Sequence, residues 1–282
     1  MVATINYCQV VFYKPKIDMN YKKFSFVAIL VCLLMVSCSN KHKRLLNSND
    51  HDAKYAAAIK AYNEKDYFHA TQLFENLLLY YRGREKAESV NLYYAKSLMG
   101  SKDYYSAAYQ FESFARWFPF SEDAQEAAFQ AAYCKYLVSP DYELDQTLTN
   151  ESMKNFQAFI DKYPNSPRVK EANECMDKMR EKLIKKDFRT SYDYFKREQY
   201  QSAQYSFRTF LNQYPDATYR EKAMYYIVVA GYRYAQNSIE DKKKERFAVV
   251  ANDYKKFEAL YPNSDKLAEL KKLYTECEKE IE

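Results

Sequence analysis

The sequence predicts an all-α solenoid of about five helix–turn–helix repeats, and two observations carry this prediction. The first is a pattern of aromatic and small residues that recurs five times with the same spacing, over residues 67–81, 104–118, 149–163, 200–214 and 247–261. The second is a proline directly after four of these copies. A helix with a single apolar stripe cannot bury that stripe alone. The recurrence therefore indicates stacked repeats that share one long core.

Each copy places its marked residues at steps of three and four. In the first copy these residues are Tyr67, Ala70, Phe74, Leu77 and Tyr81. Such steps put all of them on one stripe of an α-helix. A following proline stops the helix, because it lacks a backbone N–H and restricts the residue before it. We therefore expect one helix over each copy, which we call an aromatic helix.

A partner helix precedes each aromatic helix. In the first repeat, residues 55–62 have apolar side chains at helical spacing, and residues 63–66 form a turn into the aromatic helix. Asp66 and Asp103 stand where an N-cap would accept hydrogen bonds from free backbone N–H groups. Two helices joined by a turn, with a small residue early in the second and proline at its end, resemble the tetratricopeptide repeat.

The repeats are longer than the consensus of about 34 residues. In the third repeat we expect a loop over residues 139–150 to hold the excess. In the fourth, Ser166 is expected to cap a helix beginning at Pro167, and no breaker follows before Glu198. That helix would have ~30 residues and a length of about 45 Å. We expect it to join repeats 1–3 (residues 52–165) to a C-terminal part (residues 166–282) with repeats 4 and 5 and a final helix.

The N-terminus predicts a lipoprotein signal peptide over residues 1–37, with Met19 as the true start. Lysines precede an apolar run over residues 24–36 that spans only ~20 Å, too short for a ~30 Å hydrocarbon core. A positive start and a short apolar centre are features of signal peptides. The end, Met35-Val36-Ser37-Cys38, resembles the lipobox of bacterial lipoproteins. A plain signal peptide with a chance cysteine is the alternative.

The lipobox resemblance implies cleavage before Cys38 and acylation of its thiol. Residues 38–51 would then be a lipidated, flexible tether, because this polar stretch lacks core-forming periodicity. Ser39 carries no aspartate retention signal, which implies transfer to the outer membrane of a double-membraned bacterium.

Composition disfavours catalysis. The 282 residues include only 3 Gly and 3 His. Scarce glycine leaves no phosphate-cradling loop, and the scattered histidines form no metal-ligand spacing or catalytic triad. We expect no enzyme, no catalytic residues, no metal and no cofactor. The formal charge of +5 falls to +2 without residues 1–37, which is too small to indicate a nucleic-acid partner.

Three sequence segments carry a more specific resemblance. They are Tyr163-Pro164-Asn165-Ser166, Tyr192-Asp193-Tyr194-Phe195 at the end of the long helix, and Tyr214-Pro215-Asp216. Behind a lipobox, these segments resemble the BamD family, the tetratricopeptide lipoproteins of the outer-membrane β-barrel assembly machine. The resemblance covers roughly residues 52–282. The first repeat departs from it, with Arg82-Gly83-Arg84 in place of the proline turn.

The resemblance implies a non-enzymatic scaffold, anchored in the outer membrane by lipid on Cys38 and facing the periplasm. Its C-terminal repeats would bind a periplasmic domain of the barrel-forming subunit, and its N-terminal repeats would receive unfolded β-barrel precursors.

Four residues are candidates for partner binding. Tyr225, Tyr226 and Arg233 lie in the first helix of the fifth repeat, which carries more aromatic side chains than one core stripe can absorb. Tyrosine and arginine are favoured anchors of interface centres. In the N-terminal repeats the candidate is Tyr94. A competing interpretation is that the fifth-repeat helix is buried on two sides, by the long helix and by a C-terminal helix over residues 265–282.

Two other function classes fit an anchored repeat protein. One is a cell-envelope adaptor of the Tol-Pal or peptidoglycan type, and the other is a glycan-capturing lipoprotein of a nutrient importer. No heptad segment precedes the repeats, which disfavours the Tol-Pal coordinator. The chain also lacks the large loop insertions usual in importer lipoproteins.

Overall fold

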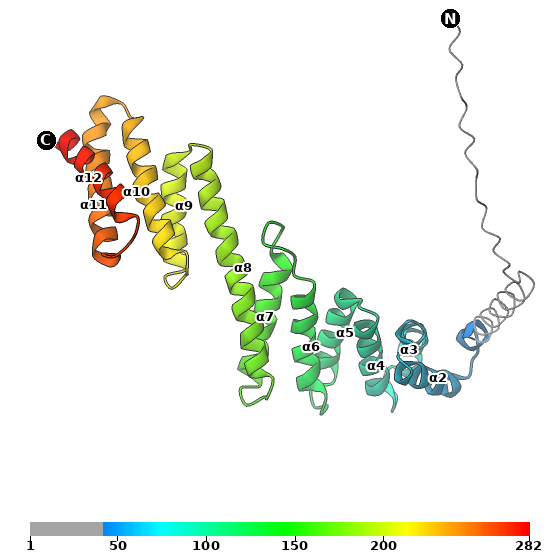
Figure 1. The fold of residues 1–282 in the computed structure, drawn as a ribbon. Coiled ribbons are helices and arrows are strands. Elements are labelled where there is room, and N and C mark those ends of the chain that lie inside the picture. The colour runs from blue at the N-terminus through cyan, green and yellow to red at the C-terminus, as the bar shows by residue number, and fades with distance from the viewer. Residues whose placement is uncertain (1–41) are drawn as a thin grey trace, which may run out of the picture. The chain divides into compact units, whose positions relative to one another are not determined.

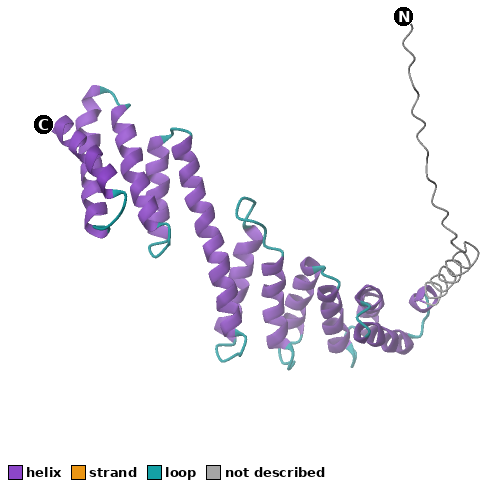
Figure 2. Ribbon diagram, viewed as in Figure 1, coloured by secondary structure: helices purple, strands orange, loops and turns teal. Residues whose placement is uncertain are grey.

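The computed structural model describes residues 42–282, and within this range every regular element is helical (Figures 1 and 2). The helices are α2 (His51–Asn63), α3 (Tyr67–Tyr81), α4 (Ala87–Gly100), α5 (Tyr104–Trp117), α6 (Ala124–Leu137), α7 (Thr147–Lys162), α8 (Val169–Lys196), α9 (Tyr200–Gln213), α10 (Arg220–Gln236), α11 (Glu240–Leu260) and α12 (Leu267–Ile281). The chain forms two compact units: the first ends at Arg84 and holds α2 and α3, and the second, Glu85–Glu282, holds α4–α12.

The first unit is a helix–turn–helix hairpin. Its core is aromatic, since the ring of Tyr55 meets the rings of Phe74 and Tyr81 edge-on at 6.4 and 6.2 Å. Lys54 is 3% exposed, and its Nζ donates to Asn76 Oδ1 at 2.6 Å. This hydrogen bond offsets part of the cost of burying the ammonium group.

Residues 42–50 belong to the segment that the sequence assigned to a tether. In the structure, residues 42–46 form a helical turn, and His42 lies against α3. Its Nε2 is 2.9 Å from Gln72 Oε1, and its ring centroid is 4.1 Å from that of His69. This part of the segment is therefore packed on the first helix pair.

In the second unit, helices that follow one another in the chain pack against one another. Three hydrophobic clusters succeed one another along it. The first joins α6, α7 and α8, the next joins α8, α9 and α10, and the last joins α10, α11 and α12. Each cluster takes side chains from helices of neighbouring repeats, which is the packing expected of a tetratricopeptide solenoid.

The predicted aromatic helices are confirmed. In all five copies the second, third and fourth marked positions are buried. These residues are Ala70, Phe74 and Leu77; Ala107, Phe111 and Phe114; Ser152, Phe156 and Phe159; Ala203, Phe207 and Phe210; and Val250, Tyr254 and Phe257. In each of the four helices followed by proline, the residue directly before the proline is the C-cap, and the helix ends one residue earlier. Ser152, the one polar residue among these buried positions, donates its hydroxyl to Ala132 O at 2.9 Å.

The turns inside repeats 1, 2 and 4 share one backbone conformation. Lys65, Lys102 and Glu198 each adopt a left-handed conformation, with φ of 61°, 65° and 59°. The N–H of the following residue then reaches back to the last turn of the first helix, as in Asp66 N to Ala61 O at 2.9 Å. Since a left-handed residue with a side chain costs about 1–2 kcal/mol, these hydrogen bonds must offset local strain.

Two of these turns also contain the predicted N-caps. The carboxylate of Asp66 accepts from His69 N at 3.3 Å, and that of Asp103 accepts from Ser106 N at 3.1 Å. The carboxylate caps of the first two aromatic helices are therefore confirmed.

Two predicted boundaries were wrong. The long helix α8 begins at Val169 rather than Pro167, because a bond from Val169 N to Ser166 O closes a tighter turn there. Ser166 Oγ accepts from Arg168 N within that turn, at 3.2 Å. The loop of the third repeat is also shorter than expected. Gln146 folds it back by donating to Asp141 O at 2.8 Å, and α7 starts at Thr147.

The long helix itself is confirmed, with 28 residues and no break from Val169 to Lys196. It contributes to the cluster with α6 and α7 and also to the cluster with α9 and α10. The division into residues 52–165 and 166–282 expected from the sequence stays a prediction.

Cys134, Cys175 and Cys277 are free and buried, and burial raises the pKa of the Cys134 and Cys277 thiols to about 12. Such thiols behave as small apolar side chains. Among residues 42–282, no helix combines the length and apolar character needed to cross a bilayer.

The first prediction concerns the core of the third repeat. Phe159 is 2% exposed, and its ring meets that of Phe129 on α6 at 5.6 Å. Phe159→Ala should lower the free energy of unfolding by about 3–5 kcal/mol, because it leaves a cavity in the cluster that joins α6, α7 and α8. Urea denaturation followed by circular dichroism measures this change. Lys154→Ala, at an exposed position of the same helix, should stay within ~0.5 kcal/mol. Equal effects of the two variants would contradict the packing described here.

Candidate functional site

Successive repeats of the second unit are joined by hydrogen bonds at the proline turns. In three turns, the serine two residues after the proline bonds to the second residue of the preceding repeat's first helix. The pairs are Ser121 Oγ to Glu88 Oε1 at 2.6 Å, Gln125 Nε2 to Ser166 Oγ at 2.7 Å, and Ser264 Oγ to Glu221 Oε1 at 2.6 Å. The fourth turn has Ala217 at this position, and there Arg180 bonds to Asp216 at 2.6 Å instead. These bonds fix how each repeat meets the next.

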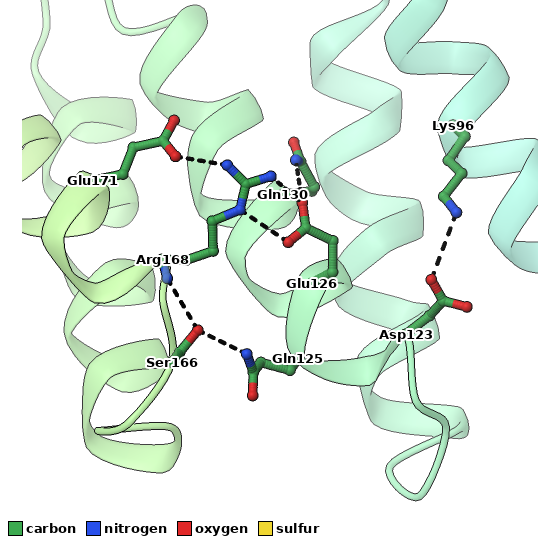
Figure 3. Close-up of polar contacts among 8 residues, drawn as sticks. All are labelled: Lys96, Asp123, Gln125, Glu126, Gln130, Ser166, Arg168 and Glu171. Atoms are coloured by element: carbon green, nitrogen blue, oxygen red, sulfur yellow. Dashed lines mark hydrogen bonds and ion pairs between the residues drawn. The ribbon is translucent and has the colours of Figure 1, made fainter.

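The most extensive of these polar contacts surrounds Arg168, at the start of α8 (Figure 3). Its guanidinium donates to both carboxylate oxygens of Glu126 on α6, at 3.0 and 2.7 Å, and to Glu171 at 2.6 Å. The same group lies 4.7 Å from the ring centre of Phe129. Such a two-pronged contact fixes orientation, which a lysine could not do. The cluster therefore links the start of α8 to α6 of the third repeat.

Electrostatics within this cluster follow from burial and hydrogen bonding. Partial burial acts to raise the pKa of the Glu126 carboxyl, but hydrogen bonds from Arg168 and Gln130 outweigh it and hold the pKa below its ordinary value. Its hydrogen bond to Glu126, and then the one to Glu171, raise the pKa of Arg168 above its ordinary value. Both shifts favour the ionised pair in the folded chain.

The fifth-repeat helix α10 is where the sequence placed three candidate residues. Tyr225 is half-buried, and its hydroxyl donates to Glu269 of α12 at 2.8 Å. About two turns further along the same side, the Tyr232 hydroxyl donates to Glu276 of α12. Burial first, and then these carboxylates, raise the pKa of both tyrosines. This side of α10 is therefore occupied by the C-terminal helix.

Tyr226 faces the long helix instead. Its ring stacks on Phe207 at 5.5 Å and lies 5.1 Å from Tyr192 and 5.0 Å from Phe195 on α8. Burial in this aromatic cluster raises the pKa of Tyr226 to about 12. Tyr225 and Tyr226 thus turn to opposite neighbours, as the competing interpretation of this helix expected.

Arg233 is the candidate on α10 whose side chain is exposed, and its guanidinium reaches Gln236 Oε1 at 3.3 Å. Its position is eleven residues, about three turns, after Lys222, so both lie on one helix face with the half-buried Val229. This face lies between the side of α10 whose tyrosines contact α12 and the side that carries Tyr226 against α8. The structure therefore separates a packed tyrosine pair from an accessible cationic face.

Tyr94 lies on α4 and is 8% exposed. It shares the buried side of that helix with Val90, Ala95 and Leu98. Tyr94 therefore lies in the core, on a different helix from the three α10 candidates. Its role in partner binding stays a prediction. Cys38, the expected lipidation site, lies outside the described residues.

Comparison with known proteins bears on this arrangement. The YfiO family, described as an outer membrane lipoprotein, matches residues 47–247. That range holds more than half of the chain. The chain belongs to this family.

A curated relative agrees with the family assignment. The chain is 23% identical over 240 residues to the outer membrane protein assembly factor BamD of Rickettsia prowazekii (strain Madrid E), covering 84% of this chain and 93% of that protein. The resemblance to the BamD family drawn from the sequence motifs is thereby confirmed.

Among solved structures, the TPR2AB domain of yeast Sti1, in a pHSP90 complex, aligns with a TM-score of 0.35. The alignment has 10% identity and covers 81% of this chain and 98% of that one. Such a score does not establish a shared fold, and the repeat architecture rests on the helix packing described above.

Arg168 and its partners were missed from the sequence. Their pairing joins residues 42 positions apart, and helical periodicity does not connect such positions. One usable signal was present, because Glu126 and Arg168 stand near the starts of successive first helices.

The second prediction tests the Arg168 cluster. Glu126→Gln should cost no more than about 1 kcal/mol at pH 7, because both partners are more than a third exposed and solvent screens the pair. A lowered folded pKa stabilises the protein above the ordinary pKa and loses that effect as pH falls. The stability gap between wild type and variant should therefore close between about pH 5 and pH 3.

Urea denaturation at several pH values measures the gap. Glu122→Gln, at an exposed position just before α6, is the control and should stay within ~0.5 kcal/mol throughout. A gap that widened on acidification would refute the assigned charge state.

Proposed function

We propose that this chain is a non-enzymatic scaffold of outer-membrane β-barrel assembly. The observation that carries the proposal is the family match over residues 47–247, together with a relative that is named as an assembly factor and is covered over 93% of its length. The architecture supports it, because stacked helical repeats present extended surfaces suited to binding proteins.

The proposed anchor is a lipid on Cys38 in the outer membrane, with the repeats facing the periplasm. Its support is the lipobox at residues 35–38 and membership of an outer membrane lipoprotein family. A single acyl chain holds a protein only weakly, so acylation of the thiol and of the new amino group would together secure the chain.

The C-terminal repeats are proposed to bind a periplasmic domain of the barrel-forming subunit. The accessible face of α10 around Arg233 supports this, since exposed arginines are frequent anchors in interfaces. Tyr225 and Tyr226 would contribute indirectly, because their contacts with α12 and α8 hold that face in position.

The N-terminal repeats are proposed to receive unfolded barrel precursors. Tyr94 is only 8% exposed and would have to reorient to touch a precursor. Tyr105 and Tyr109 on α5 are 68% and 62% exposed and stand one helical turn apart. They offer rings to an aromatic-rich strand without any rearrangement.

The third prediction tests the anchor. Radiolabelled palmitate should enter the wild-type protein and be absent from Cys38→Ala, which should appear in the soluble periplasmic fraction. Cys32→Ala, a cysteine within the expected signal peptide, is the matched control and should keep the label. Label retained by Cys38→Ala would show that another residue is acylated.

The fourth prediction tests the α10 face. Arg233→Glu should abolish co-purification of the barrel-forming subunit from detergent-solubilised membranes, because it reverses the charge of a proposed interface anchor. Its helical circular dichroism and melting temperature should equal those of the wild type, since Arg233 is exposed.

Lys272→Glu, an exposed charge reversal on α12, should leave co-purification intact. Unchanged capture by Arg233→Glu would remove this face from the interface. Recovery of Tol-Pal proteins or peptidoglycan enzymes in place of the barrel-forming subunit would favour the adaptor function.

A further inference from the structure

A groove with an aromatic floor lies between α8, the start of α10 and the loop before α7. Its volume is about 230 Å³. On the floor, the ring of Phe188 stacks on that of Tyr219 at 4.7 Å, and Tyr192 lies 5.1 Å from Tyr226. Three half-buried tyrosine rings and the largely buried ring of Phe188, which is 6% exposed, thus line the floor. They come from the first helices of repeats 4 and 5 and from the turn before α10.

The rim of this groove is cationic. Lys185 Nζ lies 4.1 Å from the ring centre of Tyr142, and Lys222 Nζ lies 5.6 Å from that of Phe188. Arg189 also lines the groove and pairs with Asp193 at 3.3 Å. Across the part of the chain that the structure describes, no ion pair joins Lys185 or Lys222 to a carboxylate.

The loop wall of the groove is held by two further lysines of α8. Lys182 Nζ donates to Ser139 Oγ at 2.6 Å and to Pro140 O at 2.9 Å. Lys186 Nζ donates to Tyr142 O at 3.1 Å and to Leu144 O at 2.8 Å. In Figure 1 this loop, between α6 and α7, lies beside the middle of α8.

The hydrogen bonds from Lys182 and Lys186 hold the loop in place before a partner binds. Burial lowers the pKa of Lys182, and its donated hydrogen bonds satisfy the ammonium group within the protein. Two lysines that bind main-chain oxygens hold Tyr142 in place over Lys185 before any partner arrives. A wall that is already ordered loses little conformational entropy on binding.

We propose that this groove binds an acidic peptide segment of a partner protein, with an aromatic side chain of that segment seated on the floor. Charge complementarity selects the acidic partner, because carboxylates would pair with the two rim lysines, which form no ion pair within residues 42–282. Aromatic rings on the floor favour an aromatic guest through edge-to-face and offset contacts.

Two carboxylates beside the groove do not cancel this preference. Glu143 accepts the Tyr142 hydroxyl at 2.8 Å and is exposed, and Asp193 is taken up by Arg189. The three rim cations therefore outnumber them. That the partner is a protein rests on the proposed scaffold function. The groove and its charges are features of this chain and do not depend on that proposal.

Fluorescence anisotropy with synthetic peptides tests the proposal on the purified full chain in detergent. The probe is a fluorescein-labelled decapeptide of alternating Asp and Phe, compared with matched peptides of alternating Asp and Ala and of alternating Lys and Phe. We expect the Asp/Phe peptide to bind most tightly and to weaken as NaCl is raised, because salt screens the lysine–carboxylate pairs. Equal binding of all three peptides, or no binding of the Asp/Phe peptide, would overturn the proposal.

Groove variants give the decisive comparison. Lys185→Glu and Lys222→Glu should each raise the Kd of the Asp/Phe peptide at least about tenfold, since they place like charges together. Lys170→Glu makes the same charge change at an exposed position of α8, fifteen residues before Lys185, and should stay within about twofold. Unaltered circular dichroism would show that the variants are folded.

Two other results would each overturn the proposal. If both variants kept the wild-type Kd, the peptide would bind at another surface and the proposal would fail. If the chain bound phosphatidylglycerol vesicles through Lys185 and Lys222 but not the peptide, the groove would be a membrane contact. Co-purification of the barrel-forming subunit, measured in parallel, separates failure of this inference from failure of the scaffold function.

Discussion

The burial of one aromatic stripe per helix pair is the constraint on which the second unit depends. Phe129 of α6 meets Phe156 and Phe159 of α7 at 5.7 and 5.6 Å, and Phe188 of α8 meets Phe207 and Phe210 of α9 at 5.6 and 5.8 Å. Burying each such ring contributes roughly 1.5–3 kcal/mol, more than the ~0.5–1.5 kcal/mol net contribution of a typical hydrogen bond. Since the stripe extends across repeats, each repeat of this unit needs its neighbour to bury its apolar side chains. The hydrogen bonds at the proline turns then join groups that apolar packing has already brought close together.

The long helix α8 shows how one element serves two such cores. Its first half places Ala172, Cys175 and Met179 against α6 and α7, and its second half places Ile184 and Phe188 against α9 and α10. The other side of the second half is cationic, with lysines that clasp the loop before α7 and line the groove. Rigid packing on one side therefore positions the binding chemistry on the other. A scaffold protein needs this combination, because an ordered surface loses little entropy when a partner binds.

Tyrosine has several roles in this chain that composition alone does not distinguish. Tyr254 is buried and stacks on Tyr274 of α12 at 4.6 Å, Tyr225 bonds to Glu269, and Tyr226 completes the aromatic floor beside α8. Exposed tyrosines such as Tyr105 and Tyr109 lie on the outer side of an aromatic helix. An apolar ring with a polar hydroxyl suits all of these places, and its neighbours decide between packing and binding.

The sequence by itself determined the helices, their stripes and the family. Steps of three and four residues, carboxylate caps at Asp66 and Asp103, and prolines after four aromatic helices act within a few residues, so they can be read without a structure. The tertiary structure decided which surfaces are free. It turned Tyr225 to α12 and Tyr226 to α8, buried Tyr94, left Arg233 exposed and assembled the groove from α8, α10 and a loop more than forty residues away. Helical periodicity states which residues share a face of one helix, but the neighbour that covers this face depends on how the repeats stack.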